Sequence, residues 1–184
     1  APGHNGRLTA PARSTGKAES EQTEPDSAVA AVIAQWHAEA EARGRDVLAS
    51  SPAFLDAIRL DMRTRETELG NLLADAVRQA TGSDVALING GNIRAALPAG
   101  DVTAADLDTI LPYDTTILTA QVPGGAVREA PELSVSRYPG EFGGFLQVSG
   151  LRFFFDPAPP AGRRGIAALV GGKARDTGAR NTVP

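Results

Sequence analysis

The stretch of sequence that decides the fold is residues 66–94, ETELGNLLADAVRQATGSDVALINGGNIR. Apolar residues recur in it at positions 69, 72, 73, 76, 77 and 80, which is the spacing of one face of an α-helix. Gly82 can end that helix in a left-handed conformation. Residues 84–88 follow as a short apolar run, which predicts a buried strand that breaks at Asn89. The stretch therefore predicts a mixed α/β fold.

The chain before this stretch is predicted to hold one helix and one short strand. Asp26 or Ser27 can cap a helix that runs to about Ala42, and Gly44 ends it. Its apolar stripe consists of Val29, Val32, Ile33, Trp36 and Ala40. A strand is expected at 47–48, and the following residues, SSPAFLDAIRLDMRTR, are predicted to be irregular. Residues 1–25 are polar, rich in Gly and Pro and without periodicity, and are predicted to be a linker or disordered tail.

The chain after this stretch is predicted to add short helices. Thr103 and Asp106 have the spacing of a capping box, so a helix should begin there and run to Ile110. A further helix can begin near Val127, but Pro131 lacks a backbone N–H and is expected to end it.

Strands make up the rest of the predicted domain. Residues 116–122 are rich in β-branched side chains, and 145–148 and 151–155 flank Ser149-Gly150 as the two arms of a predicted hairpin. One more strand is expected at 166–170. The domain is therefore predicted over 26–170, and residues 171–184 are predicted to be an irregular tail.

Composition excludes several classes of protein. The chain has 184 residues, of which 42% are hydrophobic, enough for one ordinary globular domain. Its net charge of −4 argues against nucleic-acid binding, and the lack of cysteine excludes disulfides and thiol catalysis. No apolar run approaches 18 residues, so no membrane span is expected, and the first residues lack the apolar core of a signal peptide.

The residues available for catalysis are few. The two histidines are His4, in the predicted tail, and His37, which is expected to be a solvated helix residue. Carboxylate pairs such as Asp61 with Glu66, or Asp106 with Asp108, form no known acid–base or metal motif. No P-loop or G-x-G-x-x-G joins a strand to a helix. We therefore expect neither a catalytic residue nor a metal or cofactor site in this chain.

Binding is better supported by the sequence. The segment INGGNIR follows a buried strand, where sheets of α/β proteins bind ligands, and Arg94 offers a planar fork for phosphate or carboxylate. The alternative is a Gly-Gly turn with a surface arginine. Arg59 and Arg63 lie four residues apart, but in an extended stretch they need not share a face and can simply be solvated. Tyr113 is either a stacking platform or a core residue.

In this order and spacing, ETELGNLLADA, NGGNIR and FLQVSGLRF closely resemble the C-terminal domain of the 5′-nucleotidase family, over about residues 26–164. The resemblance implies a four-layer α/β domain that recognises a nucleotide. In this family a separate N-terminal metallophosphoesterase domain holds two divalent metal ions and the catalytic Asp-His pair. The C-terminal domain rotates to deliver the substrate to that centre.

The resemblance also implies roles for individual residues. Arg63 and Arg94 match arginines that reach the phosphate or ribose, and Asn89 matches a residue near the base or sugar. Tyr113 stands where a Phe usually stacks on the base, and Gly143 matches a backbone position that lines the base pocket. Arg59 has a counterpart in only part of the family, so its role is the weakest of these expectations.

Several features depart from the family pattern. No metallophosphoesterase motif occurs, and the GGDGY-like segment that supplies a second stacking aromatic is missing, so the fold is expected to be truncated at its C-terminus. One-sided stacking should cost about 1–3 kcal/mol of binding free energy. Thr115 replaces the usual Asn, and Pro131 replaces a helical Leu.

The sequence thus predicts the nucleotide-recognition domain of a 5′-nucleotidase that needs its catalytic domain for hydrolysis. The alternatives are a stand-alone nucleoside-binding module and a non-functional remnant. By resemblance to bacterial members of the family, the expected location is the periplasm or the cell exterior.

Overall fold

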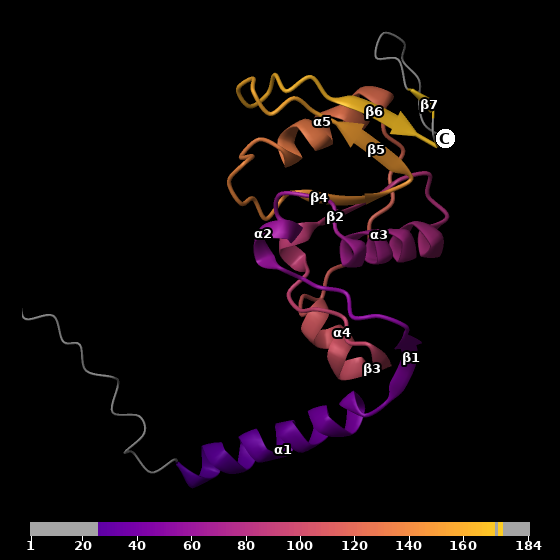
Figure 1. Ribbon diagram of the computed structural model, residues 1–184. Coiled ribbons are helices and arrows are strands. Elements are labelled where there is room, and N and C mark those ends of the chain that lie inside the picture. Colours follow the sequence, from indigo (N-terminus) through magenta and orange to yellow (C-terminus); the bar gives the residue numbers. More distant parts are fainter. Residues whose placement is uncertain (1–25, 172, 175–184) are drawn as a thin grey trace, which may run out of the picture. The chain divides into compact units, whose positions relative to one another are not determined.

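The computed structural model describes residues 26–171 together with 173 and 174 (Figure 1). The predicted tail at 1–25 and most of that at 171–184 lie outside this range. The chain divides into a unit that ends at Glu39 and a unit that begins at Ala40, and each is described by itself. No helix of the described residues is both long and apolar enough to cross a membrane.

Helix α1, Ser27–Gly44, follows Asp26, one of the two residues predicted to cap it. The Asp26 carboxylate accepts hydrogen bonds from the backbone N–H groups of Ala28 (2.9 Å) and Val29 (3.1 Å), which caps the helix. The apolar stripe of this helix is exposed, with Val29 at 56% and Trp36 at 67%.

The centre of the second unit is helix α3, Glu68–Thr81, packed against strands β2, Ala86–Asn89, and β4, Leu146–Ser149 (Figure 1). Thr67 caps α3 by accepting from the Gly70 N–H, and Gly82 ends it in the left-handed conformation, as predicted. β2 and β4 are antiparallel, with Asn89 opposite Leu146. This pair therefore brings together residues 86–89 and 146–149, which lie far apart in the sequence.

A second antiparallel pair joins β1, Val47–Ser51, to β3, Gly100–Thr103. Helix α4, Ala104–Ile110, follows β3 directly, and the predicted capping box between Thr103 and Asp106 is present. Two short helical turns, α2 at Arg59–Met62 and η2 at Gly90–Asn92, connect these elements and contact each other.

The third sheet corrects a prediction. Strands β5, Leu151–Phe154, and β6, Ala167–Val170, are antiparallel, and β7, Lys173–Ala174, pairs with β6. The predicted hairpin around Ser149-Gly150 is wrong, because β4 pairs with β2 and β5 pairs with β6. Gly150, with φ +70°, lies so close to the Asp84 carbonyl that a Cβ would overlap it, and the chain passes there from one sheet to the next.

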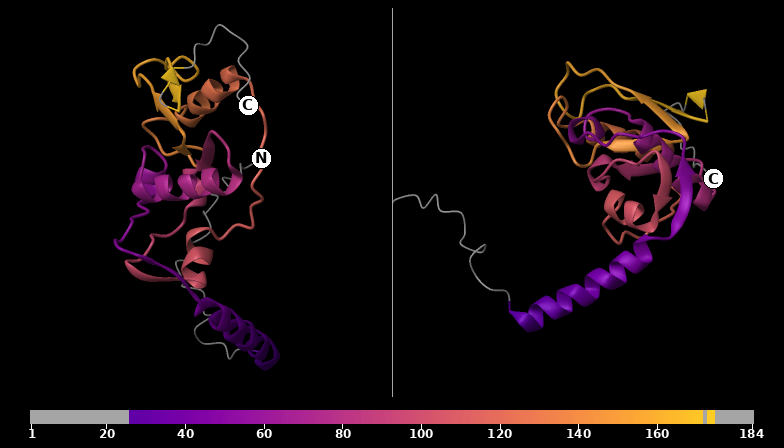
Figure 2. Two further views of the ribbon diagram at one scale, coloured as in Figure 1. Left: turned by 90° about the vertical axis from the view of Figure 1, so that its right-hand side faces the viewer. Right: turned by 60° about the horizontal axis from the view of Figure 1, so that its bottom comes forward.

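Two further predictions are wrong. Helix α5, Gly124–Ser134, continues past Pro131, whose side chain is fully buried, so packing offsets the missing N–H. Residues 116–122 form no strand, because within the described part of the chain they have no neighbouring strand to pair with, and Leu118 is 88% exposed. The left view of Figure 2 shows α5 (orange) beside the strands of the third sheet (yellow).

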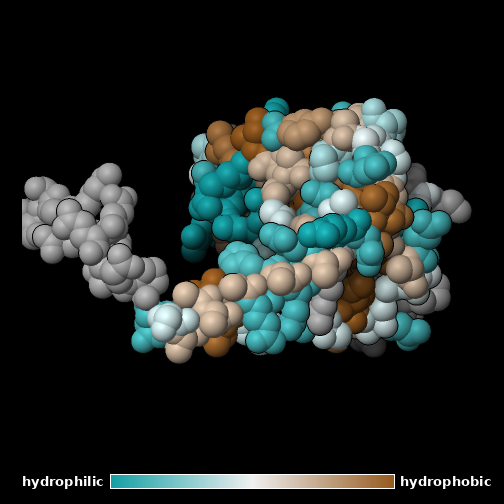
Figure 3. Space-filling model, turned by 90° about the horizontal axis from the view of Figure 1, so that it is seen from below, coloured by the Kyte–Doolittle hydropathy of each residue, from teal (hydrophilic) through white to brown (hydrophobic). Residues whose placement is uncertain are grey.

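The buried side chains form two clusters. The first contains Met62, Leu69, Ile93, Leu97, Val102 and Ile110. The second contains Val135, Phe145, Leu151, Ile166, Ala168 and Val170. Other apolar side chains are scattered over the surface (Figure 3). Mixed helices and small sheets confirm the predicted fold class.

Candidate functional site

Three arginines line one small cavity of about 140 Å³. They are Arg59 from α2, Arg63 at the end of α2, and Arg94, which follows η2; Ala57, Met62 and Ile93 complete the lining. The sequence predicted an irregular chain around Arg59, and this is wrong. Because residues 59–62 form a helical turn, side chains four positions apart meet on one face, and the turn brings Arg59 and Arg63 together.

Glu141 holds the first two arginines. Its Oε2 lies 2.7 Å from Arg59 Nε and 3.4 Å from Arg63 Nη1. The Arg63 side chain is only 13% exposed, whereas that of Arg59 is 64% exposed. Glu141 therefore makes its shorter contact with the more exposed arginine, and burial of the Arg63 side chain restricts that guanidinium in addition to its longer contact.

Arg94 is held by its backbone. Its N–H donates to the Ile110 carbonyl at the end of α4 (2.9 Å), and its Nη1 donates weakly to the Gly91 carbonyl (3.4 Å). No carboxylate pairs with Arg94 among the described residues. Its guanidinium therefore keeps most of its donors for a ligand.

The glycines of the INGGNIR segment allow a close approach between three stretches of backbone. The Gly90 N–H donates to the Phe145 carbonyl (2.7 Å), and the Gly91 N–H donates to the Gly143 carbonyl (2.9 Å). A Cβ at Gly91 would lie 2.7 Å from that carbonyl oxygen, and one at Gly90 would overlap the Met62 carbonyl. This contact places Gly143 directly beside the segment that carries Arg94.

Gln147, on β4, fixes the chain that carries Arg63, and sequence reasoning missed it. Its side chain is 1% exposed and donates to the carbonyls of Met62 (3.2 Å) and Arg65 (2.8 Å). Its Oε1 accepts from the Thr67 N–H (3.1 Å). A polar residue within the apolar run FLQV was the available signal, since buried amides satisfy backbone groups that lack other partners.

The other predicted residues do not line the cavity. Asn89 is the last residue of β2, with an exposed side chain. Tyr113 is 53% exposed and lies beyond α4. The hydrogen bond from Arg94 to Ile110 nevertheless holds the end of α4 next to Arg94. Tyr113 follows Ile110 by three residues.

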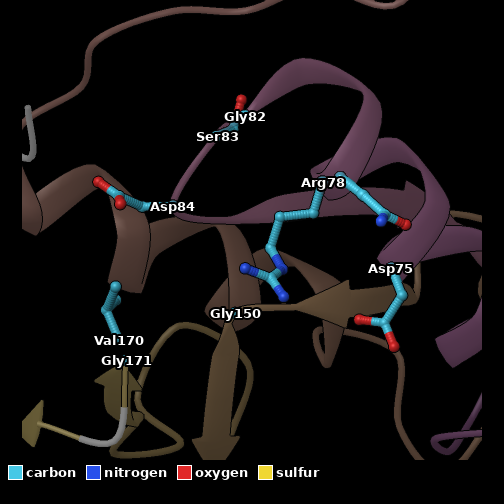
Figure 4. Close-up of a pocket in the computed structure, with 9 residues that line it drawn as sticks. Asp75, Arg78, Gly82, Ser83, Asp84, Gly150, Val170 and Gly171 are labelled. Atoms are coloured by element: carbon cyan, nitrogen blue, oxygen red, sulfur yellow. The ribbon is translucent and has the colours of Figure 1, made fainter.

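A larger cavity, of about 830 Å³, lies elsewhere, at the end of α3 (Figure 4). Turns at Gly82–Asp84, Gly150 and Gly171 form much of its wall. Arg78 Nε donates to the Ser149 hydroxyl (2.7 Å), which donates in turn to Asp75. With Asp84, the lining holds two carboxylates and one arginine. None of the predicted site residues lines this cavity.

The described residues contain no group of three or more His, Cys, Asp or Glu side chains that could hold a metal ion. The Asp106 carboxyl accepts hydrogen bonds from the Thr103 backbone N–H and hydroxyl, and these hold its pKa below the usual value of 3.8.

Comparisons with known proteins agree on one family. A sequence model described as "5'-nucleotidase, C-terminal domain" matches residues 47–177. The trifunctional nucleotide phosphoesterase protein YfkN of Bacillus subtilis (strain 168) is 30% identical over 166 residues, which cover 88% of this chain and 11% of YfkN. The snake venom 5′-nucleotidase of Naja atra is 28% identical over 159 residues, or 79% of this chain and 30% of that protein.

A solved structure gives the same result. The 5′-nucleotidase precursor from Thermus thermophilus is 31% identical and superimposes with a TM-score of 0.74. The match covers 88% of this chain and 33% of that one. The chain therefore spans a third or less of the length of these relatives.

Proposed function

The chain belongs to the 5′-nucleotidase family, as its C-terminal domain, and from this membership we propose that it recognises nucleoside 5′-monophosphates through the arginine cavity. One observation carries the proposal: Arg59 and Arg63, from one helical turn, and Arg94, from a different part of the chain, line one cavity. Guanidinium groups bind phosphate by paired, charge-assisted hydrogen bonds. An arginine cluster with a single carboxylate partner is therefore suited to a phosphate ester.

In this proposal Arg94 and Arg63 bind the phosphate or ribose. Arg94 is free of a carboxylate partner among the described residues, and the Arg63 side chain is mostly buried, with one long contact to Glu141. Arg59 is more exposed and already donates its Nε to Glu141, so its contribution is smaller. The close contact of Gly91 with Gly143 brings the Gly143 backbone beside the segment that carries Arg94.

We place the nucleoside part on the outer side of the cavity. The exposed ring of Tyr113 offers a stacking face for the base, and the exposed Asn89 amide offers polar contacts to the base or sugar. The backbone at Gly143 borders the same region through its hydrogen bond with Gly91. These assignments follow the family resemblance.

Hydrolysis to nucleoside and phosphate, and hence nucleotide catabolism, is proposed for the whole protein together with a metallophosphoesterase domain. That domain would supply the two divalent metal ions that activate the attacking water. This chain would supply recognition of the nucleotide. We also propose that the protein acts in the periplasm or outside the cell, since a venom enzyme is among its relatives.

The test is a calorimetric titration of the chain with AMP and with adenosine, with a phosphate-release assay in Mn²⁺ alongside. We expect saturable binding of both ligands, tighter for AMP, and no release of phosphate. A folded chain that binds neither ligand would contradict the proposal and favour a remnant. Binding of adenosine and AMP with equal affinity would favour a nucleoside-binding module instead.

The same titration tests the stacking role. Replacing Tyr113 by Ala should weaken AMP and adenosine alike, by about 5- to 100-fold, because one base–aromatic contact contributes about 1–3 kcal/mol. The replacement Tyr113→Phe should bind both ligands like the natural chain. Unchanged affinity in the Ala variant would make Tyr113 a residue without a role in binding.

A further inference from the structure

The structure points to Glu141 as a specificity-determining residue of the arginine cavity, an inference that rests on the proposed function. We propose that Glu141 holds Arg59 and Arg63 in place and lowers the positive charge of the cavity to match one phosphate monoester. Nothing in the sequence pattern singled out this residue. The argument depends on its contacts, its partial burial and its place in the chain.

The loop that carries Glu141 is attached to the site on both sides. The Phe142 N–H donates to the Arg63 carbonyl (3.3 Å), and the Gly143 carbonyl accepts from the Gly91 N–H (2.9 Å). These bonds hold the backbone next to Glu141 beside the arginines. The Glu141 side chain, 37% exposed, borders the cavity through its contacts with Arg59 and Arg63.

One carboxylate oxygen serves both arginines. Oε2 accepts from Arg59 Nε at 2.7 Å and from Arg63 Nη1 at 3.4 Å. Each guanidinium keeps further N–H groups that this contact does not use. Glu141 can therefore remain in place while a ligand binds the free donors, and its contact sets the direction in which they point.

The second effect of Glu141 is on the net charge of the arginine cavity. The three arginines with Glu141 leave two net positive charges at the cavity. A phosphate monoester carries about −1.5 to −2 near neutral pH, so this charge is matched. Because Glu141 repels any anion bound to its arginines, it weakens phosphate binding in general, and more for an ion of higher charge.

The test uses the full chain with Glu141→Gln, which keeps an acceptor oxygen and removes the charge. We expect Glu141→Gln to bind AMP about three- to tenfold tighter and adenosine within twofold of the natural chain, from the Coulomb energy of one charge at a partly exposed site. ADP should gain more than AMP. Unchanged or weaker AMP binding by the variant would overturn the proposal.

Two further variants separate the parts of the proposal. Glu141→Ala removes both charge and acceptor, and we expect it to bind AMP more weakly than Glu141→Gln because the arginines lose their orientation. Equal affinity of the two variants would overturn the positioning role. Glu129→Gln is the matched control, since Glu129 is exposed and has no ion pair among the described residues, and it should change no affinity.

A third probe keeps this test separate from the proposed function. Inorganic phosphate is titrated into the natural chain and Glu141→Gln while the Arg Nε–H signals are followed by NMR. If neither chain binds nucleotide, the proposed function fails, yet tighter phosphate binding by Glu141→Gln would still support the role of Glu141. No difference in phosphate binding would overturn that role.

Discussion

The arginine cavity and the cavity at the end of α3 contrast in size and in charge: one is small and positively charged, and the other is large and is not. The arginine cavity has a volume of about 140 Å³ and is lined by three arginines, of which Arg59 and Arg63 pair with Glu141. The cavity at the end of α3 has about 830 Å³, but its arginine, Arg78, is joined to Asp75 through Ser149, and Asp84 adds a second carboxylate to the lining. Volume therefore favours the cavity at the end of α3 as a ligand site, and net positive charge favours the arginine cavity as a phosphate site.

This difference shows which property identifies a binding site. A phosphate must give up water to bind, and only fixed, charge-assisted donors offset that loss. The arginine cavity offers such donors on a backbone that glycine contacts and the buried Gln147 hold in place. The larger cavity is lined mostly by turns, and its Arg78 already donates to Ser149 on β4.

The largest effect is expected where the backbone of the arginine cavity is tightest. Gly90→Ala would overlap the Met62 carbonyl, which cannot move freely because Gln147 binds it, so we expect a loss of about 3 kcal/mol or more of unfolding free energy. Gly125→Ala, with open space around it in α5, should be neutral or gain about 0.5–1 kcal/mol. Urea unfolding measures both, and equal stability of the two variants would contradict the packing described.

The next effect compares a polar residue of β4 at each cavity. Gln147→Leu leaves the Thr67 N–H and two carbonyls without partners in a buried place, so we expect a loss of about 2–4 kcal/mol and weaker AMP binding. Ser149→Ala removes contacts to two exposed side chains, which water can replace, and should cost about 1 kcal/mol or less. A larger loss for the Ser149 variant would reverse the comparison.

Ligand binding separates the two cavities directly. Arg94→Ala should weaken AMP binding about 10- to 100-fold and adenosine less than threefold, because a charge-assisted hydrogen bond is worth about 1.5–3 kcal/mol. Arg78→Ala should leave both affinities unchanged. Calorimetric titration provides the numbers. Equal losses for the two ligands in Arg94→Ala would remove the phosphate role of this arginine.

The smallest effect concerns Asp106, which caps the helix next to the arginine cavity. Its pKa is lowered in the folded chain by hydrogen bonds from Thr103, so the ionised carboxyl contributes stability above its unfolded pKa, near 3.8. That contribution is lost as pH falls through the lower, folded pKa. Asp106→Asn should therefore be less stable than the natural chain at pH 7, and this difference should shrink in acid.

The control for this prediction is Asp108→Asn, which changes the same charge on α4 at an exposed position without a partner among the described residues. Urea unfolding at pH 7 and at about pH 3 compares the three chains. A difference between Asp106→Asn and the natural chain that is the same at both pH values would show that the cap does not depend on the ionised carboxyl.

Local signals in the sequence predicted much of the fold. The apolar spacing of α3, its Gly82 end and the Thr103–Asp106 capping box depend on neighbours within a few residues, so the sequence shows them directly. The same holds for β1, β2 and β6. The family resemblance added the site residues, of which Arg59, Arg63 and Arg94 line one cavity.

Long-range contacts explain what the sequence did not predict. The direction of the chain at Gly150 depends on the Asp84 carbonyl, and β4 pairs with β2 rather than with its neighbour in sequence. The ion pairs of Glu141 with Arg59 and Arg63 join residues about 80 positions apart. Such contacts leave no periodic signal, and single charged residues are usually solvated.

The most direct test of the central claim is an NMR titration of the ¹⁵N-labelled chain with AMP. The account predicts that the backbone signals of Gly91, Arg94 and Gly143, at the arginine cavity, shift as AMP is added. Those of Gly82 and Gly150, at the larger cavity, should stay unchanged. Shifts confined to the larger cavity would contradict the account and place nucleotide recognition at the end of α3.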